Sequence, residues 1–426
     1  MLHRFLFALI FILITMSLDA QNISFTLLKP DRVFDGEAMH TDWVVLINKD
    51  TIVAAGPMKF KLPAGTRVIE LPGTTLMPGL IEGHSHFFLH PYDETPWDDQ
   101  VLKESRAERT VRAVNHARKT LMAGFTTVRD LGTEGAMYDD VGLKNSIEKG
   151  LIPGPRMIIA TRAIVAKGAY GPKSENTESD LDVGAEEVSG MESIASAVRS
   201  QIGRGADLIK VYADYSNGID NRNVPTFTVD ELKLMVAIAE LSGRKVVAHA
   251  STPDGMRNAV LAGISTIEHG DNGTLEIFKL MKERGVALCP TLAAGDAVAQ
   301  YRGWKKTRTA DGKLAEPVPI KIVNKRKTFQ LALEAGVTIC MGGDAGVFAH
   351  GDNAREMEMM VEYGMQPIEV MRSATSVNAD VFGYSAIIGR IKTGLAADIV
   401  VVEGDPSKNI SNIRKVKMVM IGGKVF

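Results

Sequence analysis

Short apolar segments alternate with amphipathic stretches through the middle of the chain. The apolar segments have the length and composition of buried strands, and the stretches between them carry apolar residues at helical spacing. Several of these helical stretches end in glycine, as in "LAG", "KERG" and "LEAG", and glycine is a common helix terminator. The eight strand-like segments are residues 75–86, 125–132, 156–163, 207–214, 245–251, 265–271, 286–292 and 337–345.

This repeated strand–helix pattern predicts an α/β fold with a (β/α)8 barrel of the TIM type over residues 79–385. An open, doubly wound sheet is the alternative, but no glycine-rich phosphate turn follows the first strand. Residues 21–78 and 386–426 have a different pattern of short β-segments separated by turns. Because strand edges need partners, we expect the two ends of the chain to form one small β-sandwich lobe.

Residues 1–20 have the layout of a secretory signal peptide. A basic start at Arg4 is followed by an apolar run from Phe5 to Ile14, and then by polar and small residues up to Ala20. The run is short for a bilayer-spanning helix, although an uncleaved membrane anchor is the alternative. We therefore expect cleavage after Ala20, although Leu18 is less typical of such a site than a small residue. The mature protein would be exported to the periplasm or secreted, without stable membrane association.

The overall composition adds few constraints. The chain has 426 residues, which suits a large barrel plus a smaller lobe, and it is 45% apolar and 23% charged. A net charge of −2 gives no electrostatic reason to expect nucleic acid as a partner. Two cysteines, Cys289 and Cys340, are too few for a disulfide scaffold. We expect buried thiols, and a single bridge between them stays open.

Polar residues interrupt the apolar segments where the predicted strands end. In barrels of this kind the active site lies at the C-terminal ends of the strands. His84 and His86 share one face of their strand because side chains alternate along it. A single histidine at a strand end is more often a hydrogen-bonded wall residue than a ligand, but four of the nine histidines fall at these ends. The converging set is His84, His86, Lys210, His249, His269 and Asp344.

These side chains favour a metal site. Imidazole and carboxylate suit Zn²⁺ and related divalent ions. The set exceeds the needs of one tetrahedral ion with an open water position, and it is too small for two ions unless a group bridges them. Lys210 could provide the bridge, because a neutral amine reacts with CO2 to give a carbamate with two oxygens. The structural alternative for Lys210 is a salt bridge with Asp344 or Glu268.

The motifs "GHSH", "LIKVY", "VVAHA", "TIEHG" and "GGDAG", in this order, resemble those of the amidohydrolase superfamily. The branch most similar to this chain contains imidazolonepropionase-like enzymes and prolidase-type, metal-dependent dipeptidases, and the resemblance covers nearly all residues after the signal. It implies that His84, His86 and Asp344 hold a first metal ion, and that His249 and His269 hold a second. It further implies a carboxylated Lys210 as the bridge, with zinc as the expected metal, and a barrel joined to a β-sandwich. Related enzymes often form homo-oligomers, but the sequence shows no contact surface.

Two divalent ions that share a hydroxide can hydrolyse an amide bond. Asp344 would then accept a proton and pass it to the leaving amine. Tyr212 would steady the oxyanion or a substrate carboxylate, with a wall aromatic as the equal alternative. In the long loops, His90, Tyr170 and Lys173 are candidate substrate contacts, with solvated loop residues as the alternative.

The expected function is therefore an exported binuclear metallohydrolase that cleaves the amide bond of a dipeptide or an N-acyl amino acid. A hydrolase of a cyclic amide such as imidazolonepropionate is one alternative. Lys210 weighs against it, because those relatives resemble a one-metal design without a bridging lysine. A non-catalytic, secreted binding protein is the other alternative, and suitable ligand types at all six positions weigh against it.

Overall fold

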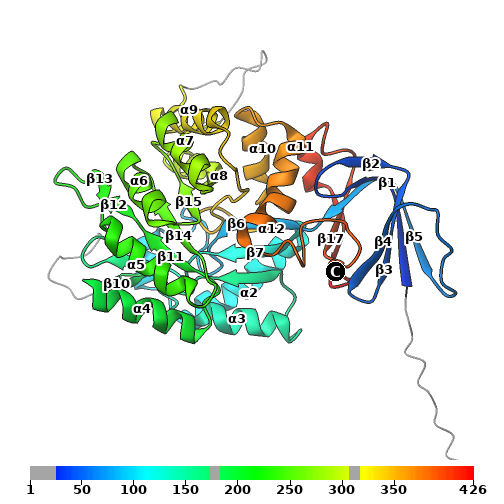
Figure 1. The fold of residues 1–426 in the computed structure, drawn as a ribbon, viewed down its shortest axis with the longest axis horizontal. Coiled ribbons are helices and arrows are strands. Elements are labelled where there is room, and N and C mark those ends of the chain that lie inside the picture. The colour runs from blue at the N-terminus through cyan, green and yellow to red at the C-terminus, as the bar shows by residue number, and fades with distance from the viewer. Residues whose placement is uncertain (1–24, 173–182, 307–316) are drawn as a thin grey trace, which may run out of the picture.

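The computed structural model describes residues 25–172, 183–306 and 317–426. Within these ranges the chain has an α/β fold, with helices packed around parallel strands and a separate β-sheet at one side of the molecule (Figure 1). The predicted signal peptide and Lys173 lie outside the described residues.

The sheet at the side of the molecule is built from both ends of the chain, as Figure 1 shows by the blue strands beside the red ones. β17 pairs antiparallel with β5, so that Val401 lies opposite Leu76, and both side chains are buried. The expected pairing of the two ends is therefore found, in one eight-stranded sheet ordered β19-β18-β17-β5-β1-β3-β4 with β2 on β1. The β-sandwich itself stays a prediction. The strands are β1 (Phe25–Phe34), β2 (Met39–Thr41), β3 (Trp43–Asn48), β4 (Thr51–Pro57), β5 (Arg67–Pro78), β17 (Ile399–Glu403), β18 (Val416–Ile421) and β19 (Lys424–Val425).

The middle of the chain contains two sheets of parallel strands, ordered β6-β7-β8 and β10-β9-β11-β14-β15-β16. Seven of the eight predicted strand segments contain one of these strands. A short antiparallel hairpin, β12 with β13, follows β11. The bounds are β6 (Leu80–Ser85), β7 (Phe125–Asp130), β8 (Arg156–Ile159), β9 (Ile164–Ala166), β10 (Glu186–Val188), β11 (Ile209–Tyr212), β12 (Asp214–Ser216), β13 (Asn223–Pro225), β14 (Val246–Ala250), β15 (Thr266–His269) and β16 (Ala287–Cys289).

The eighth predicted segment, residues 337–345, is not a regular strand. In place of a continuous ladder it has isolated parallel bridges, from Ile339 to Leu288 of β16 and from Ala345 to Ser85 of β6, together with single backbone hydrogen bonds to both strands. The backbone at Gly342 runs directly against β6 and β16, since a Cβ there would lie 2.8 Å from the His84 nitrogen. Two consecutive glycines and a left-handed Asp344 explain why the ladder is broken here.

The helices begin and end largely as the sequence indicates. A capping box of Thr228 and Glu231 opens α5, and left-handed glycines close α6, α7 and α9 at Gly263, Gly285 and Gly336. The bounds are α1 (Trp97–Leu102), α2 (Arg106–Met122), α3 (Asp139–Glu148), α4 (Met191–Arg204), α5 (Val229–Glu240), α6 (Pro253–Ala262), α7 (Leu275–Arg284), α8 (Leu292–Tyr301), α9 (Ile320–Ala335), α10 (Ala354–Glu362), α11 (Pro367–Arg372) and α12 (Asn378–Phe382). A short π-helix covers Ser373–Val377, and a short 3₁₀-helix covers Ile410–Arg414.

The sequence left open whether Cys289 and Cys340 form a disulfide. Cys289 and Cys340 are both buried and unbridged, so they are thiols. Over the three described ranges, no helix combines the length and the apolar character needed to cross a bilayer.

Candidate metal centre

The predicted ligands converge at the C-terminal ends of the parallel strands. Ligand atoms of His84, His269 and Asp344 lie within 4.8 Å of one another. His86 Nε2 lies 3.3 Å from Asp344 Oδ1, and the ring centre of His249 lies 4.5 Å from that of His269. Residues from β6, β14, β15 and the segment 337–345 are thus gathered at one point.

Three of the histidines are held through Nδ1, which leaves Nε2 available. His84 Nδ1 is 2.9 Å from Glu268 Oε2, and His86 Nδ1 is 2.8 Å from the carbonyl oxygen of Gly132. His269 Nδ1 is 2.7 Å from the hydroxyl oxygen of Thr291. Metal-binding histidines are typically oriented in this way, because an acceptor at one ring nitrogen fixes the tautomer and directs the other nitrogen at the ion.

Lys210 is fully buried within β11, and its Nζ has no hydrogen-bond partner among the described residues. The alternative of a hydrogen-bonded salt bridge with Asp344 or Glu268 is therefore not formed. Asp344 Oδ1 is also buried without a well-aligned hydrogen bond. Buried polar atoms without partners are costly and rare, and both of these atoms belong to groups that can bind cations once Lys210 is carboxylated. The donor set therefore fits divalent metal ions.

The electrostatics of the site favour neutral nitrogen ligands. Burial, reinforced by the Lys210 charge, lowers the pKa of His84 to about 4 and that of His249 to about 3. Burial also lowers the pKa of Lys210, against the opposing effect of Glu268 and Asp344. His86 differs, since the adjacent Asp344 carboxylate more than offsets burial and raises its pKa to about 9. Neutral imidazole is the form that coordinates a metal, so most of the set is ready to bind one.

Two of the candidate ligands and two residues near them have an unusual backbone conformation. His269 has a φ of 73° and Asp344 a φ of 67°, while Thr291 and Glu134 both have a φ of 49°. Residues other than glycine adopt this left-handed region at a cost, and such positions often occur at functional sites.

The comparison with known families decides the identity of the fold. The model of the amidohydrolase family matches residues 75–426, which is most of the chain. The chain belongs to the amidohydrolase family. It is therefore an enzyme that hydrolyses carbon–nitrogen bonds.

Named relatives of this amidohydrolase act on different compounds. It is 30% identical to an ochratoxinase of Aspergillus niger over 382 residues, which cover 82% of this chain and 75% of that protein. A crystal structure of a Xaa-Pro dipeptidase with bound methionine in the active site is 30% identical with a TM-score of 0.83, and the match covers 95% of this chain and 100% of that one. An imidazolonepropionase of Sphingopyxis alaskensis is 23% identical over 403 residues, which cover 87% and 89% of the two chains.

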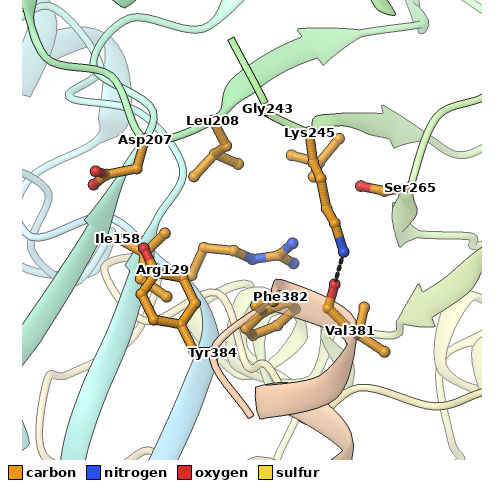
Figure 2. Close-up of a pocket in the computed structure, with 12 residues that line it drawn as sticks. Arg129, Ile158, Asp207, Leu208, Gly243, Lys245, Ser265, Val381, Phe382 and Tyr384 are labelled. Carbon is orange, nitrogen blue, oxygen red and sulfur yellow. Dashed lines mark hydrogen bonds between the residues drawn. The ribbon is translucent and has the colours of Figure 1, made fainter. Parts of the chain in front are cut away.

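Sequence reasoning missed the residues that hold the amidohydrolase ligands in place. Arg129 Nη2 lies 2.8 Å from Glu268 Oε1, and its guanidinium carbon is 4.1 Å from the ring centre of Phe382. Arg129 lines a pocket of about 250 Å³. Figure 2 shows it there together with Lys245, whose Nζ donates a hydrogen bond to the carbonyl oxygen of Val381. Other lining residues precede β11, β14 and β15, so the pocket lies at the end of the strands opposite the ligands. A charged residue inside the apolar segment "FTTVRDLG" was the available signal for Arg129.

Glu82 and Lys325 were also missed, and both bind the backbone beside ligands. Glu82 Oε1 accepts hydrogen bonds from the His84 nitrogen at 3.0 Å and from the Gly343 nitrogen at 2.9 Å. Lys325 Nζ donates to the His269 carbonyl at 2.8 Å. These contacts connect β6 to residues 337–345 and fix the end of β15.

Replacing Glu268 by glutamine is expected to weaken metal binding by about 10- to 100-fold, because an outer carboxylate that orients a histidine ligand contributes this much. Glutamine also leaves the Arg129 guanidinium without its anionic partner. Titration of metal-depleted protein with Zn²⁺ measures the change. Glu276→Gln is the control, since Glu276 is exposed and paired with Arg257 on the protein surface. Equal affinity in the two variants would contradict a role for Glu268.

The structure brings two of the three described candidate substrate contacts together. The rings of Tyr170 and Tyr212 have centres 4.7 Å apart, and the Tyr212 ring stacks on His249 with centres 4.6 Å apart. His90 is held elsewhere, with Nε2 2.8 Å from Glu104 Oε1 and Nδ1 3.2 Å from Glu94 Oε2. Through these contacts His90 stabilises the loop after β6.

Proposed function

We propose that this amidohydrolase is an exported dipeptidase with a binuclear metal centre, which cleaves the amide bond of dipeptides or N-acyl amino acids. The proposal depends on one observation, the buried Nζ of Lys210 next to the converging histidines, which has no hydrogen-bond partner in the described part of the chain. A carbamate on this nitrogen would satisfy it and would bridge two ions. Similarity to a Xaa-Pro dipeptidase over 95% of the chain supports a peptide-like substrate.

The proposal includes the architecture predicted from the sequence. We infer that residues 79–385 close into a (β/α)8 barrel, supported by bridges from residues 337–345 to β6 and β16. A hydrogen bond of 2.8 Å from the Asp207 nitrogen to the Ile159 carbonyl also connects β8 to the start of β11. Residues 21–78 and 386–426 would form the accompanying lobe, and residues 1–20 would direct export. The N-terminal sequence of the exported protein tests the last assignment.

His84, His86 and Asp344 would hold one ion, His249 and His269 the other, and Lys210 would bridge them. When bound, two divalent ions lower the pKa of water from about 15.7 to near 7 and polarise the substrate carbonyl. Burial would raise the pKa of Asp344, but His84 and His86 outweigh this effect and keep the pKa low, so the carboxylate is ionised and able to accept a proton. Its Oδ1 would accept a proton from the attacking water and deliver it to the leaving nitrogen.

Removal of metal by a chelator is expected to abolish amide hydrolysis, and addition of Zn²⁺ is expected to restore it. Elemental analysis of the restored enzyme should give two ions per chain. A panel of dipeptides and N-acyl amino acids measures activity, with imidazolonepropionate as the comparison substrate. Full activity with one ion per chain would remove the binuclear design, and turnover of imidazolonepropionate alone would replace the dipeptidase proposal.

A further inference from the structure

A buried carboxylate that the proposed mechanism does not use lies beside the metal centre. Glu134 follows β7, is only 2% exposed and has a left-handed backbone. Its contacts among the described residues come from three neutral donors. Trp97 Nε1 is 3.1 Å and the Tyr170 hydroxyl 2.5 Å from Oε2, and the Tyr212 hydroxyl is 3.4 Å from Oε1.

The charge of Glu134 interacts with His86 and Lys210 at longer range, but none of its three hydrogen bonds comes from a cation. Burial of a carboxylate whose direct donors are all neutral is costly. A carboxylate offers about four acceptor positions, and here only three are used, one of them by a long contact to Oε1. Glu134 Oε1 therefore keeps capacity to accept a further hydrogen bond, which a positively charged donor would fill best.

Aromatic rings surround the position that such a donor would take. The ring centre of Tyr170 lies 4.7 Å from that of Tyr212, 4.9 Å from that of Tyr215 and 5.4 Å from that of Trp97. Burial and the nearby Glu134 raise the pKa of Tyr170 well above the usual value, so its hydroxyl stays a neutral donor. The faces of aromatic rings attract cations, and a carboxylate among them adds charge selectivity.

This cluster adjoins the position of the reacting amide. Gly132, whose carbonyl oxygen accepts a hydrogen bond from His86, lies two residues before Glu134, and Tyr212 stacks on His249. In a dipeptide the α-amine is two bonds from the carbonyl carbon that is attacked. A group bound at the metal centre can therefore place its amine at Glu134.

We propose that Glu134, Tyr170 and Tyr212 form a subsite for a protonated amine of the substrate, a role that rests on the proposed function. The subsite makes the enzyme prefer dipeptides with a free amino terminus to N-acyl amino acids. The sequence left open that Tyr212 binds a carboxylate of the substrate. This role is disfavoured, because the negative charge of Glu134 would repel a carboxylate there.

The test compares Ala-Leu with propionyl-Leu, which lacks only the amine, in the zinc-loaded wild type and in Glu134→Gln. We expect wild-type kcat/KM to favour Ala-Leu by about 10- to 100-fold, the usual effect of a hydrogen bond to a charged group. Glu134→Gln should lose this preference, because its kcat/KM falls on Ala-Leu and stays unchanged on propionyl-Leu.

A second comparison uses Ala-Lys and Ala-norleucine. A preference for Ala-Lys that depends on Glu134 would assign the subsite to a side-chain amine. Glu104→Gln is the matched control, because this carboxylate is also largely buried but is bonded to His90.

Equal losses of Glu134→Gln on both members of each pair would overturn the subsite and assign Glu134 a structural role. If the wild type hydrolyses none of these compounds, the dipeptidase proposal fails, and binding decides the subsite. Calorimetry then compares alaninamide with its neutral analogue lactamide. Tighter binding of alaninamide that disappears in Glu134→Gln supports the subsite, and equal binding overturns it.

Discussion

Lys210→Ala is expected to lower kcat/KM for the best dipeptide by about 10³-fold or more and to reduce the metal content below two ions per chain. The loss follows from the position of the side chain, which is buried beside four histidines, with no hydrogen-bond partner for its Nζ among the described residues. Removal of a bridging ligand removes transition-state stabilisation of several kcal/mol that a second ion provides. Steady-state kinetics and elemental analysis on the same preparation measure both effects.

Two additions make the Lys210 experiment specific. Lys245→Ala removes a lysine from the pocket at the opposite end of the strands and should leave metal content and activity unchanged. Short carboxylic acids added to Lys210→Ala should restore part of the activity, because a carboxylate supplies the two oxygens of the lost carbamate. Full metal content and full activity in Lys210→Ala would exclude the bridge.

Asp344→Asn is expected to reduce kcat by about 10²- to 10⁴-fold at saturating Zn²⁺, the usual contribution of a general acid–base group. Asparagine keeps the shape of the side chain but cannot carry a proton between the water and the leaving nitrogen. Saturating metal separates this effect from weaker coordination, and circular dichroism confirms the fold. Asp254→Asn on the exposed start of α6 is the control. A reduction of kcat no larger than in that control would mean that another group transfers the proton.

The convergence of the candidate ligands was predictable because its signals are local. His84 and His86 alternate along one strand, and the others end apolar segments that the helical spacing separates. Their convergence followed from the rule that parallel strands present their C-terminal ends at one edge. The structure adds distances, such as 3.3 Å between His86 Nε2 and Asp344 Oδ1, that no spacing along the chain contains.

The residues that support the site were not predictable, since their partners are distant in the sequence. Glu268 orients His84 and is itself held by Arg129 from another strand, and neither contact leaves a periodic pattern. Glu134 lies in a polar loop where a carboxylate would ordinarily be solvated, and only the tertiary fold buries it. The irregular path of residues 337–345 has the same origin, because the close approach of Gly342 to His84 depends on both neighbouring strands.

The left-handed backbone at Glu134, His269, Thr291 and Asp344 affects how this protein would respond to laboratory evolution for stability. Each of these residues gives up on the order of 1 kcal/mol that glycine would recover. A selection for thermal stability alone would therefore favour glycine at these positions of the candidate site. It would yield variants that are stable but inactive. Screens for more thermostable variants of this enzyme therefore need to measure turnover in the same round of selection.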